Sequence, residues 1–214
     1  MKVSKKVGTE EIYRILKRRI IELEYEPGEV LNEVDVADEF NISRTPIRKV
    51  FHQLSNDNLL NIIPRFGAQV APIDFMYMKS VFEVTRVLDP FAARLAVDRI
   101  TDEQMEELEE IIDRLQNYDI EVDYQKAIID DQQFHDIIFL SSGNLCLQEI
   151  LLDLHNHTER LWHYSQRYFD SMDLFTDSLG KILESIKQGN KDMAEKYARE
   201  HIDAFVDKIK QELL

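Results

Sequence analysis

Apolar residues between positions 36 and 60 recur at intervals of three and four, the spacing of amphipathic helices, with one interruption. They are Ala37, Phe40, Ile42, Ile47, Phe51 and Leu54. Asn41 is expected to end a first helix, and Ser43 to cap a second one through its hydroxyl group. Pro46 follows in the first turn, where its missing N–H costs nothing. The pattern therefore predicts two helices joined by a tight turn.

The first turn of the second helix carries Arg44, Thr45 and Arg48. In a helix-turn-helix, this end of the second helix is the one that approaches base edges. Two guanidinium groups here can bind phosphate or guanine with paired hydrogen bonds. The residues favour contact with double-stranded DNA, and a helical pair used only for structure or for protein contacts is the alternative.

A two-stranded hairpin is predicted directly after these helices. The segment 61–70 contains an apolar pair, a Pro-Arg-Phe-Gly turn and a further apolar step. Arg65 is expected at or near the tip of this hairpin. Such a wing would reach an adjacent DNA backbone or minor groove.

Length and charge divide the chain into two expected domains, residues 1–73 and 74–214. The 214 residues exceed the usual length of a single core, about 100 to 150 residues. Residues 1–73 contain 11 Lys plus Arg and 11 Asp plus Glu, so the whole excess of 15 negative charges lies in residues 74–214. A polyanion is repelled by that second region, so DNA contact is expected in the first domain alone.

The second domain is predicted to be entirely helical. Glycine and proline become rare after the expected hinge at residues 71–74, and helical apolar spacing dominates. The expected helices begin at 74 or 75 and cover 74–97, 101–117, 122–140, 144–168, 171–187 and 191–214. Six amphipathic helices bury a core by packing as an antiparallel bundle. The fold class is thus mainly α, a winged helix-turn-helix followed by a helical bundle.

Three polar residues of this bundle occupy positions where the helical spacing calls for apolar ones. Asp131 and His135 follow the line from Ile128 to Ile138, and His201 lies between Tyr197 and Phe205. A carboxylate and imidazoles that face a core must be paired, hydrated or coordinated to a cation. Asp with His suits zinc, nickel or manganese.

Residues 9–72 resemble the amino-terminal domain of the GntR family of bacterial transcription regulators. The resemblance rests on an opening helix from Thr9 and on four further segments: the Pro27-Gly28 turn, the Leu31-Asn32-Glu33 entry to the next helix, the Ser43-Arg44-Thr45-Pro46-Ile47-Arg48 core and the Pro64-Arg65-Phe66-Gly67 wing. It implies that Arg44 and Arg48 contact bases or nearby phosphates, that Ser43 and Thr45 contact the backbone, and that Arg65 with Gly67 approaches the minor groove. Val34 stands where some relatives carry an arginine.

Residues 75–212 are similar to the FCD effector domain of the FadR subfamily. The matching motifs are Asp131-x-x-x-His135, Gly143-Asn144, Gly189-Asn190 and Arg199-x-His201. The resemblance implies one Asp and three His around a divalent ion, beneath a pocket for a small carboxylate. Asp131, His135 and His201 match three of these ligands. Leu179 occupies the fourth position, and its side chain cannot coordinate a metal.

Two further residues are expected to line the effector pocket. His157 shares a helix face with Ile150, Leu154 and Leu161, and is interpreted as pocket lining first and as a ligand second. Thr85 replaces an arginine that is common in relatives, and Arg86 stands beside it.

The resemblances imply a homodimer that places two recognition helices in successive major grooves of a near-palindromic operator. A small carboxylate bound in the bundle would release a repressor from DNA. A metal-dependent hydrolase or isomerase using Asp131, His135 and His201 is the alternative from another class. The single cysteine, Cys146, and the lack of an apolar run of about 18 residues favour a cytoplasmic protein without a membrane span.

Overall fold

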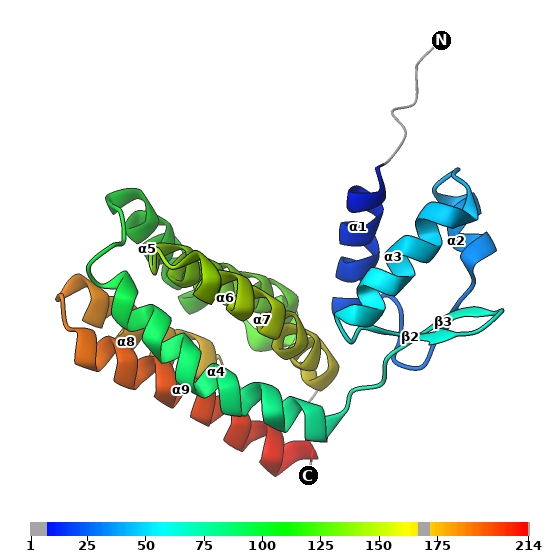
Figure 1. Ribbon diagram of the computed structural model, residues 1–214. Coiled ribbons are helices and arrows are strands. Elements are labelled where there is room, and N and C mark those ends of the chain that lie inside the picture. Colours follow the sequence, from blue (N-terminus) through cyan, green and yellow to red (C-terminus); the bar gives the residue numbers. More distant parts are fainter. Residues whose placement is uncertain (1–7, 167–171, 214) are drawn as a thin grey trace. The chain divides into compact units, whose positions relative to one another are not determined.

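The computed structural model describes residues 8–166 and 172–213, and the chain divides into two compact units, Met1–Asp74 and Phe75–Leu214 (Figure 1). Each unit has its own core and is described separately. Residues 71–74, which connect them, have no regular secondary structure. None of the described helices combines the length and the apolar composition that crossing a bilayer demands.

The first unit is a small helical domain with a three-stranded sheet. Its elements are α1 Thr9–Ile21, β1 Val30–Leu31, α2 Glu33–Glu39, α3 Arg44–Asn56, β2 Leu60–Ile63 and β3 Gly67–Val70. The sheet is antiparallel in the order β1-β3-β2. Apolar faces of the three helices and the sheet close one core around Leu16, Ile47 and Phe51. The predicted winged helix-turn-helix is confirmed.

The turn between α2 and α3 follows from local backbone preferences. Asn32 caps α2, because its side chain accepts a hydrogen bond of 2.7 Å from the backbone N–H of Val34. Asn41 has a φ of 51°, a left-handed conformation that asparagine tolerates after a helix end. Ser43 occupies the N-cap position of α3, but its hydroxyl accepts no capping hydrogen bond, so that expectation was wrong. Pro46 is the third residue of α3 and lacks one of the two N–H groups that a cap can bind.

The wing is formed by β2 and β3, which pair from Leu60 opposite Val70 to Ile63 opposite Gly67. Arg65 lies in the turn with a φ of 72°. Gly67 is buried, and a Cβ at this position would overlap the carbonyl oxygen of Leu31 on β1. The close approach of β1 to β3 therefore requires glycine here.

The second unit consists, in its described part, of six helices, which confirms the predicted all-helical bundle. They are α4 Phe75–Ala96, α5 Asp102–Gln116, α6 Ile120–Ser141, α7 Leu145–Ser165, α8 Asp173–Lys187 and α9 Lys191–Leu213. Thr101 begins α5 with a reciprocal pair of hydrogen bonds to Gln104, the capping box. The expected helix ends at Tyr168, Ser171 and Leu214 lie outside the described residues.

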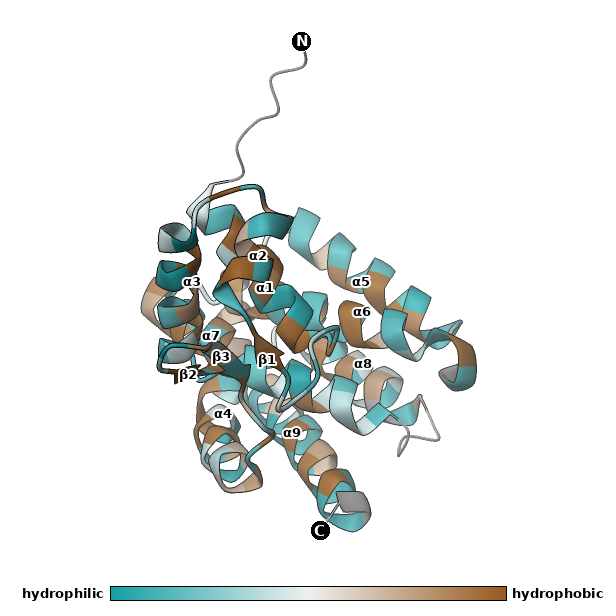
Figure 2. Cartoon of the chain, turned by 90° about the vertical axis from the view of Figure 1, so that its right-hand side faces the viewer, coloured by the Kyte–Doolittle hydropathy of each residue, from teal (hydrophilic) through white to brown (hydrophobic). Residues whose placement is uncertain are grey.

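Helices α4 and α9 run side by side along the bundle, with α8 against α9, while α6 and α7 pack together and against α4 (Figure 1). Brown and teal alternate along the helices in Figure 2, as expected when one face of each helix is buried. Apolar side chains such as Phe134, Leu161 and Phe175 fill the interior. Helices α4, α6, α7 and α9 also enclose a cluster of buried polar side chains.

Candidate functional site

The two arginines at the start of α3 share one acidic partner, Glu33 of α2. Arg48 donates two hydrogen bonds to the Glu33 carboxylate, at 2.9 and 2.7 Å, and Arg44 donates one at 3.1 Å. The arginine side chains remain 59% and 57% exposed, whereas Glu33 is 15% exposed. Since guanidinium has five N–H donors, each arginine keeps donors that face solvent.

The charge of this triad is one positive unit at neutral pH. The hydrogen bonds from Arg48 lower the pKa of Glu33 to about 2, with a smaller contribution from Arg44. Glu33 is therefore ionised and cancels one of the two guanidinium charges. The arrangement holds both arginines at the exposed end of α3 and limits the positive charge they present.

The other residues expected at DNA lie nearby in the sequence but differ in exposure. Ser43 and Thr45 are exposed at the start of α3, and Arg65 is exposed in the turn of the wing. Gly67 is buried against β1, where it allows the close packing of β1 on β3.

In the helical unit, the structure brings Asp131 and His135 of α6 together with His201 of α9. The Nε2 atoms of the two histidines are 3.2 Å apart. Asp131 Oδ1 is 3.8 Å from His201 Nε2, and Asp131 Oδ2 is 3.9 Å from His135 Nε2. Ligand atoms of a tetrahedral zinc ion with bonds of about 2.0 to 2.1 Å stand about 3.3 Å apart. The three side chains therefore surround a volume suited to a cation.

The electrostatic state of this group also fits a cation. Burial raises the pKa of Asp131 to about 7 and lowers the pKa of His135 well below its usual value. Asp131 Oδ1 is buried without a hydrogen-bond partner among the described residues. Ser178 Oγ lies 2.7 Å from His201 Nδ1, the kind of outer partner that orients a metal-binding imidazole.

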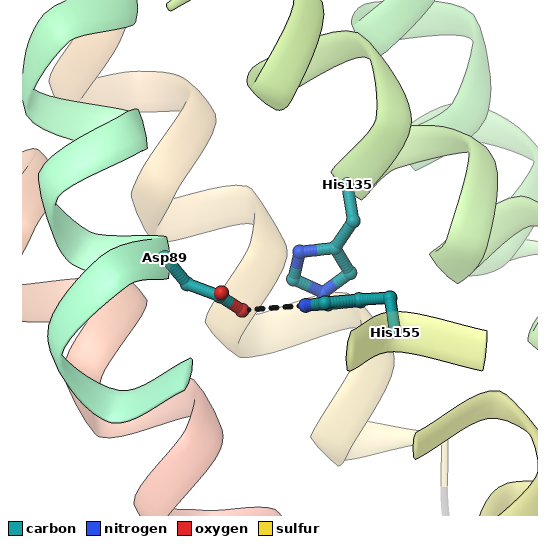
Figure 3. A group of neighbouring side chains, drawn as sticks. All are labelled: Asp89, His135 and His155. Atoms are coloured by element: carbon teal, nitrogen blue, oxygen red, sulfur yellow. Dashed lines mark hydrogen bonds and ion pairs between the residues drawn. The ribbon is translucent and has the colours of Figure 1, made fainter. Parts of the chain in front are cut away.

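A second group, Asp89 of α4 and His155 of α7, meets the same His135. Figure 3 shows Asp89 and His155 directed at each other beside the His135 ring, with 2.7 Å between Asp89 Oδ2 and His155 Nε2. Burial lowers the pKa of His155, but the charge and hydrogen bond of Asp89, together with the charges of Asp131 and Asp136, raise that pKa above its usual value. The five side chains come from four helices.

Asp89 and His155 were not identified from the sequence. Both show the feature that identified Asp131, a polar residue at a position where the helical spacing calls for an apolar one. Asp89 interrupts the buried stripe of α4, and His155 lies on the buried line of α7 formed by Leu147, Leu151, His155, Thr158 and Trp162. The sequence pattern assigns the inward face of α7 to Ile150, Leu154, His157 and Leu161, of which Leu161 is fully buried. Ile150 is in fact 44% exposed, because the buried face of α7 lies elsewhere around the helix.

A cavity of about 30 Å³ lies among these polar side chains, and its lining also includes the aromatic rings of Phe82, Trp162 and Phe205. Arg86 and His157 do not line it. Arg86 pairs with Asp203 at 2.7 Å on the wall of a separate hollow of about 540 Å³. The His157 ring packs edge-on against Tyr77. Leu179 is fully buried on α8.

Both halves of the chain match families of known proteins. Residues 8–70 match the family described as bacterial regulatory proteins, gntR family. Residues 80–204 match the family described as FCD domain, and this match alone covers more than half of the chain.

Relatives and solved structures agree with these matches along nearly the whole chain. The chain is 24% identical over 208 residues to the uncharacterized HTH-type transcriptional regulator YdhC of Bacillus subtilis, covering 95% of this chain and 91% of that protein. It is 24% identical over 206 residues to the HTH-type transcriptional repressor RspR of Escherichia coli, covering 94% and 89%. The structure of E. coli McbR/YncC superposes with a TM-score of 0.80 at 20% identity, covering 96% of this chain and 98% of that one.

Proposed function

The chain belongs to the GntR family of bacterial transcriptional regulators and carries an FCD domain, and on this premise we propose that it is a repressor released from its operator by a small carboxylate. The matched families and relatives are regulators, so a metal-dependent hydrolase or isomerase built on Asp131, His135 and His201 is set aside. The repressor direction is supported by the name of the relative RspR.

The observation that carries the DNA-binding proposal is the exposed arginine pair on α3. Arg44 and Arg48 keep more than half of their side-chain surface in solvent although both contact Glu33. At the first turn of a recognition helix they can reach guanine O6 and N7 or phosphate oxygens. Ser43, Thr45 and Arg65 would add contacts to the DNA backbone and to the minor groove. These contacts position the helix, whereas base contacts supply specificity.

The test is a gel shift with DNA from upstream of the protein's own gene. We expect the double variant Arg44→Ala with Arg48→Ala to lose the specific shift, because each bidentate base contact contributes about 1 to 3 kcal/mol. The matched control is Lys126→Ala with Lys196→Ala, which removes the same charge from two exposed lysines of the helical unit. A specific shift that survives in the arginine variant, at the affinity of the parent, contradicts the assignment.

For the sensor half, we propose that Asp131, His135 and His201 hold one divalent cation of the zinc, nickel or manganese class. The support is the ring of ligand atoms 3.2 to 3.9 Å apart and the buried Asp131 oxygen that lacks a hydrogen-bond partner among the described residues. A bound cation supplies an electrophilic centre to which the carboxylate of an effector can bind. The protein residues position that centre and exclude bulk water from it.

The cation proposal is tested by elemental analysis of purified protein. The parent is expected to contain one divalent ion per chain. The variant His201→Ala is expected to contain less than one, because it lacks one of the three ligands. Equal metal content in both proteins removes His201 from the site.

We further propose that the regulator acts as a homodimer whose two α3 helices read half-sites about 34 to 36 Å apart. The effector would change DNA affinity through the segment 71–74 that connects the two units. Linkage then requires operator DNA to change effector affinity by the same factor.

A further inference from the structure

The buried polar cluster contains more acidic charge than the three proposed ligands account for. Asp89 and Asp131 are 3% and 5% exposed, and each has an Oδ1 atom that is buried without a hydrogen-bond partner among the described residues. An isolated buried carboxylate is costly unless it is paired or coordinated to a metal. Two such oxygens beside one cavity indicate that the cluster is incomplete without a positive ligand.

His135 links the two halves of the cluster. A ring nitrogen of His135 lies within 4.8 Å of ligand atoms of Asp131 and His201 in one group, and a ring nitrogen of His135 lies within 4.8 Å of ligand atoms of Asp89 and His155 in the other. The rings of His135 and His155 have centroids 4.9 Å apart, and those of His135 and His201 5.1 Å apart. His135 is the residue that both groups share, and neither group contains His155 together with Asp131 and His201, so His155 reaches a cation held by those residues only if its side chain shifts.

The Asp89–His155 pair has the form of a metal-binding imidazole with its outer partner. Metal-ligating histidines commonly direct one ring nitrogen at a carboxylate, which fixes the ring and makes the other nitrogen a better ligand. Asp89 Oδ2 occupies this outer position at 2.7 Å from His155 Nε2, as Ser178 Oγ does for His201 (Figure 3). The two imidazoles next to His135, those of His155 and His201, are thus each held by an outer oxygen atom.

We propose that His155, oriented by Asp89, completes the coordination of the divalent cation held by Asp131, His135 and His201, in place of the histidine absent at Leu179. This inference rests on the proposed cation site and adds its fourth protein ligand. Four protein ligands, Asp131 with three imidazoles, then match the usual number for zinc, and the effector carboxylate would bind as a fifth ligand. The dication also offsets the charges of the two buried carboxylates, which no hydrophobic lining of the cavity can do.

The experiment is a Zn²⁺ titration of full-length, chelator-stripped protein in competition with a chromogenic chelator. The parent is expected to bind one Zn²⁺ per chain. His155→Ala and Asp89→Asn are each expected to weaken binding at least tenfold, because even loss of an outer partner costs about 10- to 100-fold in metal affinity. Circular dichroism establishes that each variant is folded, and Asp89→Asn preserves side-chain volume if His155→Ala does not fold.

The matched control is His163→Ala, which removes another buried histidine of α7 that belongs to neither group. It is expected to bind Zn²⁺ as the parent does. Co²⁺ substitution supplies a second readout: the visible absorption of the Co²⁺ protein should change in His155→Ala, because water replaces a nitrogen ligand, and should stay unchanged in His163→Ala.

Two results would overturn the inference, and they are distinguishable. If His201→Ala loses Zn²⁺ while His155→Ala and Asp89→Asn bind it as tightly as the parent, the cation site stands and His155 is not its ligand. If the parent itself binds no Zn²⁺, the proposed cation site fails and the inference fails with it.

Discussion

Glu33 sets how much positive charge the start of α3 offers to DNA. Its carboxylate accepts three hydrogen bonds from two arginines and stays ionised at neutral pH, since its pKa is about 2. If the two arginines contact DNA as proposed, Glu33 already holds them in place, which lowers the entropy lost on binding. One of their two charges is cancelled, which weakens attraction to phosphates of any sequence.

The variant Glu33→Gln is therefore expected to bind non-operator DNA more tightly and to discriminate less between operator and scrambled duplex. The measurement is fluorescence anisotropy with both duplexes at one salt concentration. Asp38→Asn is the matched control, because it removes an exposed acidic charge from the same helix, α2. Equal discrimination in Glu33→Gln and the parent would show that Glu33 has no part in specificity.

The same carboxylate makes folding stability depend on pH. The folded pKa of Glu33 is about 2, below the usual 4.5, so its contribution is present above pH 4.5 and is lost as the pH falls from 4.5 toward 2. The stability of Glu33→Gln, measured by urea unfolding across this range, should fall less steeply than that of the parent.

At the scale of the elements, a proline in α4 removes one backbone hydrogen bond of that helix, and a side chain of α9 replaces it. Pro90 lies inside α4 and lacks the N–H that would bind the carbonyl of Arg86, four residues earlier. Arg199 of α9 donates a hydrogen bond of 2.9 Å to that carbonyl. A helix packed against its neighbour thus satisfies a backbone group that its own helix leaves open.

A double-mutant cycle tests this compensation. Arg199→Met is expected to lower the free energy of unfolding by about 1 kcal/mol in the parent, the usual contribution of such a bond. The loss should be smaller in the Pro90→Ala background, where the substituted alanine supplies the helical N–H. Equal losses in both backgrounds, measured by urea unfolding, would mean that Arg199 acts through its ion pair with Glu195 instead.

The spacing of apolar residues predicted the helices, because each helix has enough turns for the residues on its buried face to recur at intervals of three and four. The strand β1 has only two residues, too few to show an alternation, and the sequence did not predict it. The sequence predicted Asp131, His135 and His201 because each interrupts an apolar line. It missed Asp89 and His155 because the buried face of α7 was assigned to the wrong side of the helix, and because spacing within one helix does not reveal which helices meet.

At the scale of the whole molecule, α4 presents an apolar stripe to solvent in the single chain. Val84, Val87 and Phe91 are 44%, 59% and 43% exposed and follow helical spacing of three and four. Exposed apolar residues grouped on one face are typical of interaction surfaces. A second copy of the chain is the occupant that the proposed two-half-site operator requires.

The variant Val87→Glu is accordingly expected to shift the protein from dimer to monomer, because it places a charge in the apolar interface. Light scattering after size exclusion measures the mass, and operator affinity should fall more than about tenfold, since a monomer contacts one half-site alone. Val122→Glu, on α6, is the control for adding a charge at an exposed valine outside the stripe. A parent that is already monomeric would contradict the dimer proposal directly.

The cavity between the histidines also bears on how fast the regulator can respond. With about 30 Å³ it admits a water molecule or a bare ion, whereas pockets for organic ligands usually exceed about 300 Å³. The rings of Trp162 and Phe205 line it, stacked with centroids 3.9 Å apart. If the proposed effector binds beside these histidines, it fits only after the side chains around the cavity move apart, so the rate of derepression would level off at the frequency of that movement once the metabolite is abundant.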